Sequence, residues 1–414
     1  MYYLMPFGSG FVCVVLVGTM FSLSSVHWLG IWAGLELNLI GFVPLLVYSG
    51  AVSETQSGVK YLVVQALGSG MLMFGSLLMF SSAFAWEVES DFNPYGVLVV
   101  CFGLMVKLGV FPFHFWVPSV MAGASWNACL ILATWQKIAP IFLLSSLTWA
   151  KELISFKIMF IIAGLSSLAG GVGGLNQTQM RPLLAYSSIT HLGWMVYCMC
   201  FSQVGVKMYM CIYLLTTSMV IVLAWLVDCD VFSQASNFLK GKFFVYVTLM
   251  VLLLSMGGMP PFLGFAGKWI ALSSGLGLAG ILTASLLILG SLLSLSYYLG
   301  LMFSLLFSSV DTKQLSSSWV AWHDNTNIDS SLVLVIYLAG LFLILSLSGS
   351  LFILVEGLWF NFLYAVVFFY KSQSYWDFMY SIRNLVWVSR NCSEFAYSGW
   401  ARATWCSSWS WPTV

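Results

Sequence analysis

Residues 101–118, CFGLMVKLGVFPFHFWVP, place one lysine, Lys107, and two prolines within an otherwise apolar stretch. Proline removes a backbone N–H donor and clashes with the preceding helical turn, so a helix through this stretch must break. An apolar helix that carries both a break and a charge is typical of a membrane protein with a polar or hydrated interior. The stretch therefore predicts a helical membrane protein in which Lys107 faces inward.

The composition of the whole chain indicates the same class. Its 414 residues are 60% hydrophobic and 7% charged, whereas soluble domains carry about 25% charged residues. Lipid must therefore be the solvent for most of the chain. The net charge of +1, without a basic block, argues against nucleic acid as a partner. The first residues form neither a signal peptide nor a transit peptide, which predicts synthesis in a bacterium or inside an organelle.

We predict about eleven membrane-spanning helices from the apolar segments. They cover residues 7–24, 26–48, 57–83, 95–120, 124–148, 154–175, 177–200, 205–228, 243–273, 276–307 and 329–352. The predicted fold class is therefore all-α, a polytopic membrane protein. The lysines of the predicted loops favour an N-terminus on the matrix or cytoplasmic side.

The predicted domains are a transmembrane domain, residues 1–352, and a C-terminal region, residues 353–414. Glu356 interrupts the apolar stretch 353–370, and residues 371–414 are rich in Trp, Ser and Tyr, a composition that favours the membrane interface. We expect a short interfacial or re-entrant helix followed by an aromatic-rich arm. A twelfth crossing over residues 353–370 is the alternative.

Four ionisable residues lie well inside predicted helices: Glu36, Lys107, Lys137 and Lys268. A charged side chain at the centre of a membrane helix costs about 2.5–3.5 kcal/mol. We therefore expect all four to face a protein-lined or water-filled interior and to carry function. Two other interpretations stay open. A lysine near a helix end can extend to the headgroups, and Glu36 can form a purely structural ion pair with a lysine.

A second helix break is predicted at residues 257–265, GGMPPFLGF, shortly before Lys268. Broken helices occur at membrane depth only where they are buried in protein or line a hydrated cavity. His114 and His191 lie in the same apolar surroundings, and imidazole exchanges protons near neutral pH. For each histidine, a structural hydrogen bond to a neighbouring helix is the alternative. The predicted proton relay consists of Glu36, Lys107, Lys137, Lys268, His114 and His191.

The nine cysteines and four histidines show no pattern of a metal or redox site. None of the cysteines forms a CxxC pair, and the histidines are scattered along the chain. Iron–sulfur clusters need grouped thiolates, and a haem needs a placed axial ligand. We therefore expect no cofactor, no metal and no redox chemistry in this chain.

The stretches that carry these residues resemble the antiporter-like membrane subunits of mitochondrial respiratory complex I. The matching stretches are WLGIWAGLELNLIGFVPLL, VKYLVVQALGSGMLMFGSLL, LMVKLGVFPFHFWVPSV, LATWQKIAPI, GGLNQTQMRPLLAYSSITHLGWM and GGMPPFLGFAGKW. They follow the order of the family and span about residues 20–300. The sequence departs from the family at Ser119, where an acidic residue is usual, and in its last residues, which extend past the usual end.

The resemblance implies an inverted-repeat fold with two broken helices, shortened at its N-terminus, in the inner mitochondrial membrane. It implies one proton channel of a pump driven by quinone reduction elsewhere in the complex, so the chain is part of an enzyme only as a subunit. By position, Glu36, Lys107, Lys137 and Lys268 match the functional charges of the family, with His114 and His191 as relay members. The implied partners are other membrane-arm subunits, including neighbouring antiporter-like subunits, accessory subunits and lipid.

Two other functions stay open at this stage. One is a stand-alone cation/proton antiporter that works without partner subunits. The other is a structural membrane scaffold whose buried charges only hold helices together.

Overall fold

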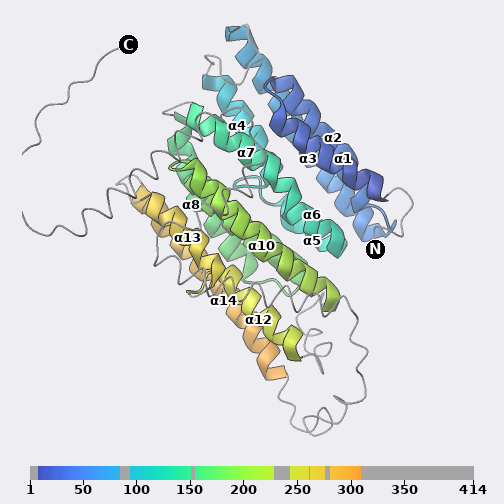
Figure 1. Cartoon of the computed structure of the whole chain (residues 1–414), viewed down its shortest axis with the longest axis vertical. Helices are drawn as coiled ribbons and strands as arrows, with labels where there is room; N and C mark the ends of the chain where they lie inside the picture. Colours follow the sequence, from blue (N-terminus) through green and yellow to red (C-terminus); the bar gives the residue numbers. More distant parts are fainter. Residues whose placement is uncertain are drawn as a thin grey trace, which may run out of the picture. The chain divides into compact units, whose positions relative to one another are not determined.

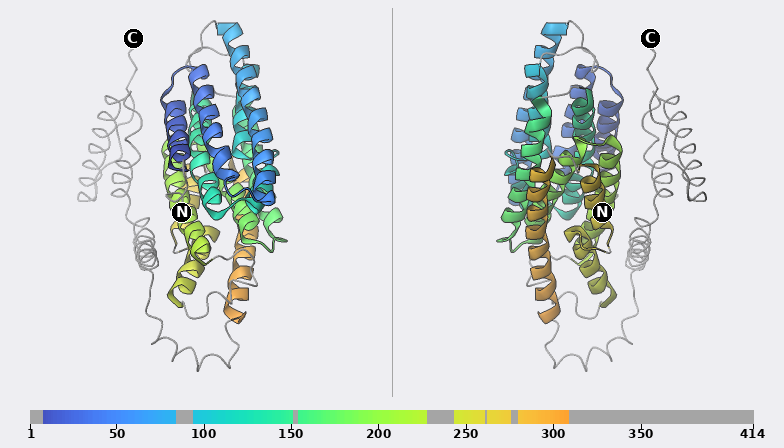
Figure 2. Two further views of the ribbon diagram at one scale, coloured as in Figure 1. Left: turned by 90° about the vertical axis from the view of Figure 1, so that its right-hand side faces the viewer. Right: turned by 90° about the vertical axis from the view of Figure 1, so that its left-hand side faces the viewer.

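The computed structural model describes residues 8–83, 94–150, 154–227, 243–260, 262–275 and 280–308. All of these residues belong to one compact unit within residues 1–358. Figures 1 and 2 show the described helices side by side, with their axes along one common direction. The helices in chain order are α1 (Gly8–Ser24), α2 (Trp28–Leu46), α3 (Val52–Ala83), α4 (Pro94–Leu108), α5 (Trp116–Gly123), α6 (Trp126–Ala133), α7 (Trp135–Ala150), α8 (Ile154–Gly174), α9 (Met180–Met199), α10 (Gln203–Val227), α12 (Phe243–Gly257), α13 (Leu263–Ser274) and α14 (Ile281–Ser308).

The described helices confirm the all-α fold class, and each of the first ten predicted segments overlaps at least one of them. The eleventh segment, 329–352, and the predicted C-terminal region, 353–414, lie outside the described residues. Length and composition allow five of the described helical stretches to cross a membrane by themselves. These are Trp28–Leu46, Val52–Met79, Trp126–Leu147, Gln203–Leu226 and Ile281–Phe303.

Helix α3 begins at Val52, five residues before the start that hydropathy predicts. The Glu54 carboxylate lies in its first turn and accepts hydrogen bonds from the backbone N–H of Ser49, at 3.1 Å, and from the Ser49 hydroxyl. A carboxylate near a helix N-terminus is favourable because the exposed N–H groups and the helix dipole are positive there. The polar residues before the apolar segment therefore join the helix.

Both predicted helix breaks are present, and they share one geometry. Helix α4 ends before Gly109 and α12 ends before Gly258, and both glycines have positive φ angles, +72° and +79°. The N–H groups of Gly109 and Val110 both bond to the carbonyl of Met105, while those of Gly258 and Met259 bond to that of Leu254. This is the glycine-terminated Schellman cap of a helix C-terminus. Each break therefore exposes a negative helix end inside the bundle.

A third interruption, at Thr134 between α6 and α7, was not expected from the sequence. Thr134 closes α6 by donating its hydroxyl proton to the carbonyl of Leu130. Pro140, inside α7, has no N–H to donate to the carbonyl of the residue four positions earlier. The chain is thus locally irregular on both sides of Lys137.

Small residues bring the helices into close contact. Helix α1 packs on α2, and α8 packs on α9 and α14. A Cβ atom added to Gly34 of α2 would lie 2.5 Å from the backbone nitrogen of Ser22, and one added to Gly170 of α8 would lie 2.6 Å from the carbonyl oxygen of Tyr186. Backbones this close require glycine, as small-residue motifs in membrane helices do.

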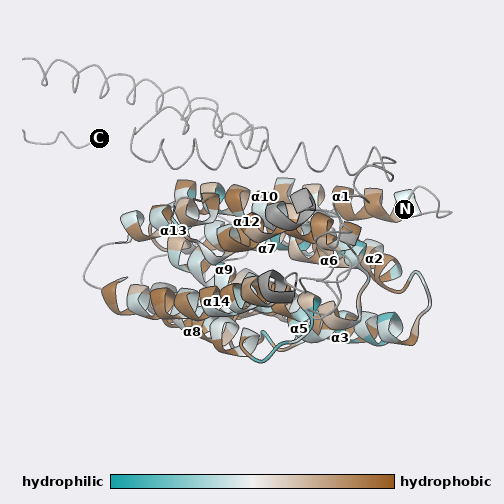
Figure 3. Cartoon of the chain, turned by 90° about the horizontal axis from the view of Figure 1, so that it is seen from below, coloured by the Kyte–Doolittle hydropathy of each residue, from teal (hydrophilic) through white to brown (hydrophobic). Residues whose placement is uncertain are grey.

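Many large apolar side chains are exposed on the outside of the bundle, and Figure 3 colours much of the helical ribbon brown for hydrophobic residues. On α3, Val59, Val63 and Leu67 follow one another at helical spacing and are 63%, 51% and 63% exposed. A contiguous exposed apolar stripe of this kind suits lipid or a neighbouring membrane subunit rather than water. The polar residues described next lie on the inside.

Candidate functional site

Three lysines are buried in the interior of the bundle, and they come from three different helices. Lys107 of α4, Lys137 of α7 and Lys268 of α13 are 7%, 4% and 7% exposed. None of the three forms an ion pair with a carboxylate within the described part of the chain. Buried charges need polar partners, so the neighbours of each lysine decide what it can do. These three residues are called the lysine line below.

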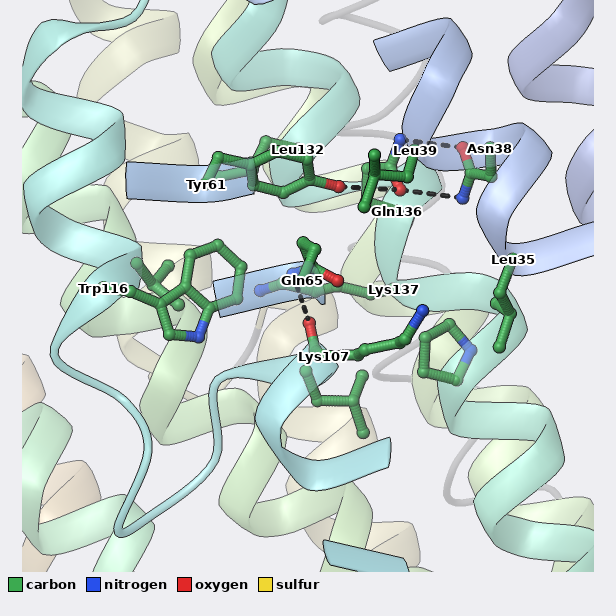
Figure 4. A pocket seen from close by; sticks show the side chains of 13 residues that line it. Leu35, Asn38, Leu39, Tyr61, Gln65, Lys107, Trp116, Leu132, Gln136 and Lys137 are labelled. Atoms are coloured by element: carbon green, nitrogen blue, oxygen red, sulfur yellow. Dashed lines mark hydrogen bonds between the residues drawn. The ribbon is translucent and has the colours of Figure 1, made fainter. Parts of the chain in front are cut away.

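Lys107 occupies the last turn of α4, directly before the first break. Its side chain passes over Gly68 of α3, where an added Cβ would lie 2.9 Å from the Lys107 Cγ atom. Gln65, one turn earlier on α3, donates its amide to the Lys107 carbonyl at 3.4 Å, as drawn in Figure 4. Glu36 of α2 interacts electrostatically with Lys107 without touching it. Glu36 is partly exposed and forms no ion pair with Lys107, so the predicted Glu36–Lys107 pair is an interaction at a distance and not a direct contact.

Lys107 and Lys137 line the same small internal cavity. It offers about 20 Å³ of space for the centres of water molecules, and a single water needs about 10–15 Å³ measured in this way. Its wall also contains Asn38 and Gln136, whose side-chain amides exchange two hydrogen bonds of 2.8 and 2.9 Å (Figure 4). The hydroxyl of Tyr61 donates to the same Gln136 oxygen at 3.4 Å. The cavity combines polar and apolar side chains and has room for about one water molecule beside the two lysines.

Lys137 has a neutral partner on α10. Its ammonium donates to the hydroxyl of Tyr213 at 2.9 Å and lies 5.1 Å from the centre of the Tyr213 ring. The Tyr213 hydroxyl in turn donates to the carbonyl of Ala133 at 3.0 Å, at the end of α6. The interruption at Thr134 therefore places a helix-end carbonyl, a hydroxyl and the ammonium in one row. Such a row can hold a charge without a carboxylate.

His191 of α9 lies between Lys137 and Lys268. Its Nδ1 atom and the Tyr209 hydroxyl share a hydrogen bond of 2.9 Å, in which the donor depends on the tautomer of the ring. The ring centre is 5.4 Å from that of Tyr213, the partner of Lys137. His191 also interacts electrostatically with both lysines and contacts the backbone of Met256 at the end of α12. It is therefore placed to link the two sites.

Lys268 is the last residue of the lysine line and lies beside the second helix break. Its ammonium donates to the carbonyl of Gly257, the last residue of α12, at 2.7 Å. The carbonyls at a helix C-terminus have no partner within the helix and carry partial negative charge, so a cation is favourable there. Gly258, the residue that ends the helix, leaves the space through which the lysine reaches this carbonyl.

The structure thus brings together five of the six residues predicted for the relay: Glu36, Lys107, Lys137, His191 and Lys268. The helices that carry these residues extend from α2, blue in Figure 1, to α13, yellow in Figure 1. His114 lies apart, in the turn between α4 and α5, where its ring is 5.9 Å from Phe111 and 4.1 Å from Phe115. No described contact joins it to a lysine, so its role stays a prediction.

Several polar residues of the site were not identified from the sequence: Asn38, Tyr61, Gln65, Gln136, Tyr209 and Tyr213. Asn38, Gln65 and Gln136 are amides inside apolar segments, and this feature could have marked them. Tyrosines are common in membrane helices and gave no signal. Among the described residues, no group of three or more His, Cys, Asp or Glu side chains could hold a metal ion.

The arrangement can store and pass protons. A lysine in a low-dielectric interior changes its protonation state when a neighbouring charge appears or leaves. Hydroxyl, imidazole and water both accept and donate hydrogen bonds, so they can carry a proton between lysines without a covalent intermediate. Among the described residues the site shows no activated nucleophile, and its groups are of the kinds that take part in proton transfer.

Comparison with known proteins places this site in a family. Residues 25–294 match the family described as NADH:quinone oxidoreductase/Mrp antiporter, TM. NADH-ubiquinone oxidoreductase chain 2 of Equus caballus is 40% identical over 70% of this chain and 83% of that protein. The chain 2 protein of Sus scrofa is 36% identical over 71% and 84%.

The fold is also found among solved structures. A chain of respiratory complex I from Thermus thermophilus, solved with bound aureothin, superposes with a TM-score of 0.69 over 83% of this chain and 78% of that chain, at 21% identity. This likeness supports the fold, and the sequence matches above define the family. The chain belongs to the NADH-ubiquinone oxidoreductase chain 2 family of antiporter-like membrane proteins.

Proposed function

We propose that this chain translocates protons as a membrane subunit of respiratory complex I, and that Glu36 and the lysine line carry the protons with His191 as a link. The membership in its family makes the chain a membrane subunit of a proton-translocating NADH:quinone oxidoreductase. The names of its relatives, which include mammalian NADH-ubiquinone oxidoreductase chains, support a location in the inner mitochondrial membrane. Quinone reduction takes place elsewhere in that complex and supplies the energy.

One observation carries the assignment of the path: three lysines are 4–7% exposed, and the ammonium groups of Lys137 and Lys268 donate to neutral groups, a hydroxyl and a backbone carbonyl. A lysine kept only for stability would be expected beside a carboxylate, because a buried pair compensates its own charge. A lysine beside a hydroxyl or a carbonyl instead changes its protonation when a charge nearby appears or is neutralised. This is the property that a proton carrier needs.

The first step of the path follows from the position of Glu36. Its carboxylate acts on Lys107 through space, so a proton bound by Glu36 removes that influence on the Lys107 ammonium. A change at Lys107 is transmitted through the cavity to Lys137, then through Tyr213 and His191 to Lys268. No step needs a metal, a cofactor or a covalent bond to the chain.

The partners proposed for this chain are the neighbouring membrane-arm subunits of the complex, with accessory subunits and lipid around them. The exposed apolar faces, such as Val59, Val63 and Leu67 on α3, support contacts of this kind. Residues 353–414 are proposed to form an interfacial helix and an aromatic-rich arm against a neighbouring subunit.

The assignment is tested by replacing Lys137 with methionine in the assembled complex. The matched control is Lys60→Met, since Lys60 is an exposed lysine of α3 outside the path. We expect Lys137→Met to assemble and to lose most of its quinone-coupled proton pumping, and Lys60→Met to pump normally. Normal pumping by an assembled Lys137→Met complex would reject the path and favour the scaffold. Transport by the isolated chain in liposomes would favour the stand-alone antiporter.

A further inference from the structure

Two adjacent tyrosines on α14 are buried polar residues that the lysine line does not use. Tyr297 and Tyr298 are 7% and 1% exposed, and their ring centres lie 4.7 Å apart. Within the described ranges, neither hydroxyl has a partner in hydrogen-bonding geometry. Buried polar groups are nearly always satisfied in native proteins, so a pair of unsatisfied hydroxyls needs an explanation.

Tyr298 lies next to the hydrogen-bond partners of Lys137 and Lys268. A Cβ atom added to Gly257 would be 3.7 Å from the Tyr298 ring, and the Gly257 carbonyl is the one that accepts from Lys268. Tyr298 also interacts with Tyr213, the hydroxyl partner of Lys137. One tyrosine of α14 is therefore adjacent to the partners of two lysines.

Hydroxyl groups of α9 continue the row. The hydroxyl of Tyr298 lies close to Ser187, and that of Tyr297 lies close to Thr190. Ser187 and Thr190 donate their own protons to carbonyls of their helix, at 2.8 and 2.6 Å. Their oxygens keep lone pairs that can accept a proton from a tyrosine. The row thus offers a donor and an acceptor at each position.

The ring of Tyr297 lies beside the C-terminal end of α8. The ring packs on Gly174, where an added Cβ would lie 2.6 Å from the Cε1 atom of the ring. Gly174 is the last residue of α8, which packs against α14 in Figure 1. The following residue, Leu175, is 45% exposed and opens the turn 175–179, most of which lies at the surface of the chain. The hydroxyl row therefore leads from the lysine line to the buried phenol of Tyr297, whose ring packs on the residue directly before an exposed turn.

We propose that Tyr298 and Tyr297 form a side branch that passes protons between the lysine line and the membrane surface at residues 175–179. The branch extends the proposed function and rests on it. In each step an ammonium or hydroxyl gives up its proton as the next oxygen accepts one, so one bond to hydrogen breaks while another forms. No electron leaves the path, and the tyrosines end each cycle as neutral phenols.

The test uses Tyr297→Phe and Tyr298→Phe in the assembled complex. Each change removes one oxygen and keeps the ring, and no protein group loses a partner, so both complexes are expected to assemble. The control is Tyr186→Phe, because Tyr186 is a half-buried tyrosine that packs on Gly173, next to Gly174, and takes no part in the path. Quinone reduction and proton pumping are measured in H₂O and in D₂O.

We expect both branch variants to turn over about fivefold to tenfold more slowly than the unchanged complex, because each loses one oxygen that would hold a proton on the way, at a cost of about 1 kcal/mol. Their ratio of rates in H₂O and D₂O should rise, since proton transfer then limits the rate, and Tyr186→Phe should change neither quantity. A purely structural role would lower the amount of complex and leave the isotope ratio unchanged.

Each remaining outcome has a distinct meaning. Normal rates in both branch variants, together with impaired pumping in Lys137→Met, would overturn the branch and leave the lysine line intact. Normal pumping in Lys137→Met as well would overturn the proposed function. Failure of both branch variants to assemble would show that the hydroxyls stabilise the fold, and it would also overturn the branch.

Discussion

Replacing Gly258 with alanine would move Lys268 without removing its charge. An added Cβ would lie 2.5 Å from the Lys268 Nζ atom, 2.8 Å from Cε and 2.9 Å from Cδ. The far end of a lysine is flexible, so the side chain would shift and the backbone would stay. The shift takes the ammonium away from the Gly257 carbonyl, its 2.7 Å partner. The perturbation therefore tests whether the position of Lys268 matters.

Two costs are expected, and they can be separated. A residue other than glycine in a left-handed conformation costs about 1–2 kcal/mol. A lost hydrogen bond to a charged group costs about 1.5–3 kcal/mol. If transport requires Lys268 at the helix end, the second cost corresponds to about a tenfold to hundredfold drop in turnover, because each 1.36 kcal/mol is tenfold in rate.

The matched control is Gly50→Ala. Gly50 also has a positive φ angle, +70°, but no atom lies within 4 Å of its added Cβ. The Gly50→Ala variant therefore has only the cost of placing alanine in a left-handed backbone conformation. Proton pumping and quinone reduction are measured for both variants in the assembled complex, normalised to the amount of complex. We expect Gly50→Ala to pump normally and Gly258→Ala to be strongly impaired. Equal activities in the two variants would refute the role of the Lys268 position.

Two further predictions concern stability. Asn38→Leu removes the two hydrogen bonds between buried Asn38 and the half-buried Gln136 amide and should destabilise the chain by about 1–3 kcal/mol. Asn38→Leu combined with Gln136→Leu should cost less than the sum of the two single changes. Thermal unfolding of the complex measures both effects, and full additivity would contradict the pairing. Gly34→Ala should force α1 and α2 apart, because the added Cβ would meet the backbone of Ser22, and it should lower the yield of assembled complex. The control is Gly10→Ala on α1, where no atom lies within 4 Å of the added Cβ and the yield should stay unchanged. Equal yields of the two variants would contradict the packing argument.

The positions of the buried charges could be predicted because an ionisable residue within an apolar segment is recognisable from the sequence alone. Lys107, Lys137 and Lys268 each lie where hydropathy placed them, inside the bundle. The breaks beside Lys107 and Lys268 were equally visible, because proline and glycine act locally on the backbone. These features depend only on near neighbours in the chain.

The partners of the lysines could not be predicted because tertiary packing decides them. Tyr213 is 76 residues from Lys137, and Gln136 is 98 residues from Asn38. Nothing in the local sequence distinguishes Tyr213 from the other tyrosines of the chain. The interruption at Thr134 was missed for a related reason. Its nearest proline, Pro140, lies inside α7, so the break does not coincide with a breaker residue.

The two Schellman caps suggest why this bundle holds cations without carboxylates beside them. Lys107 lies within the helix that ends at Gly109, whereas Lys268 reaches back from α13 to the helix that ends at Gly258. The negative end of α12, fixed by backbone geometry, accepts the hydrogen bond of Lys268, and Lys107 lies in the last turn of α4, beside the other such end. A fixed dipole stabilises a charge but does not titrate, unlike a carboxylate. Within the described part of the chain, Glu36 is the carboxylate that acts on Lys107, so in the proposed path a proton bound by Glu36 first changes the balance at Lys107.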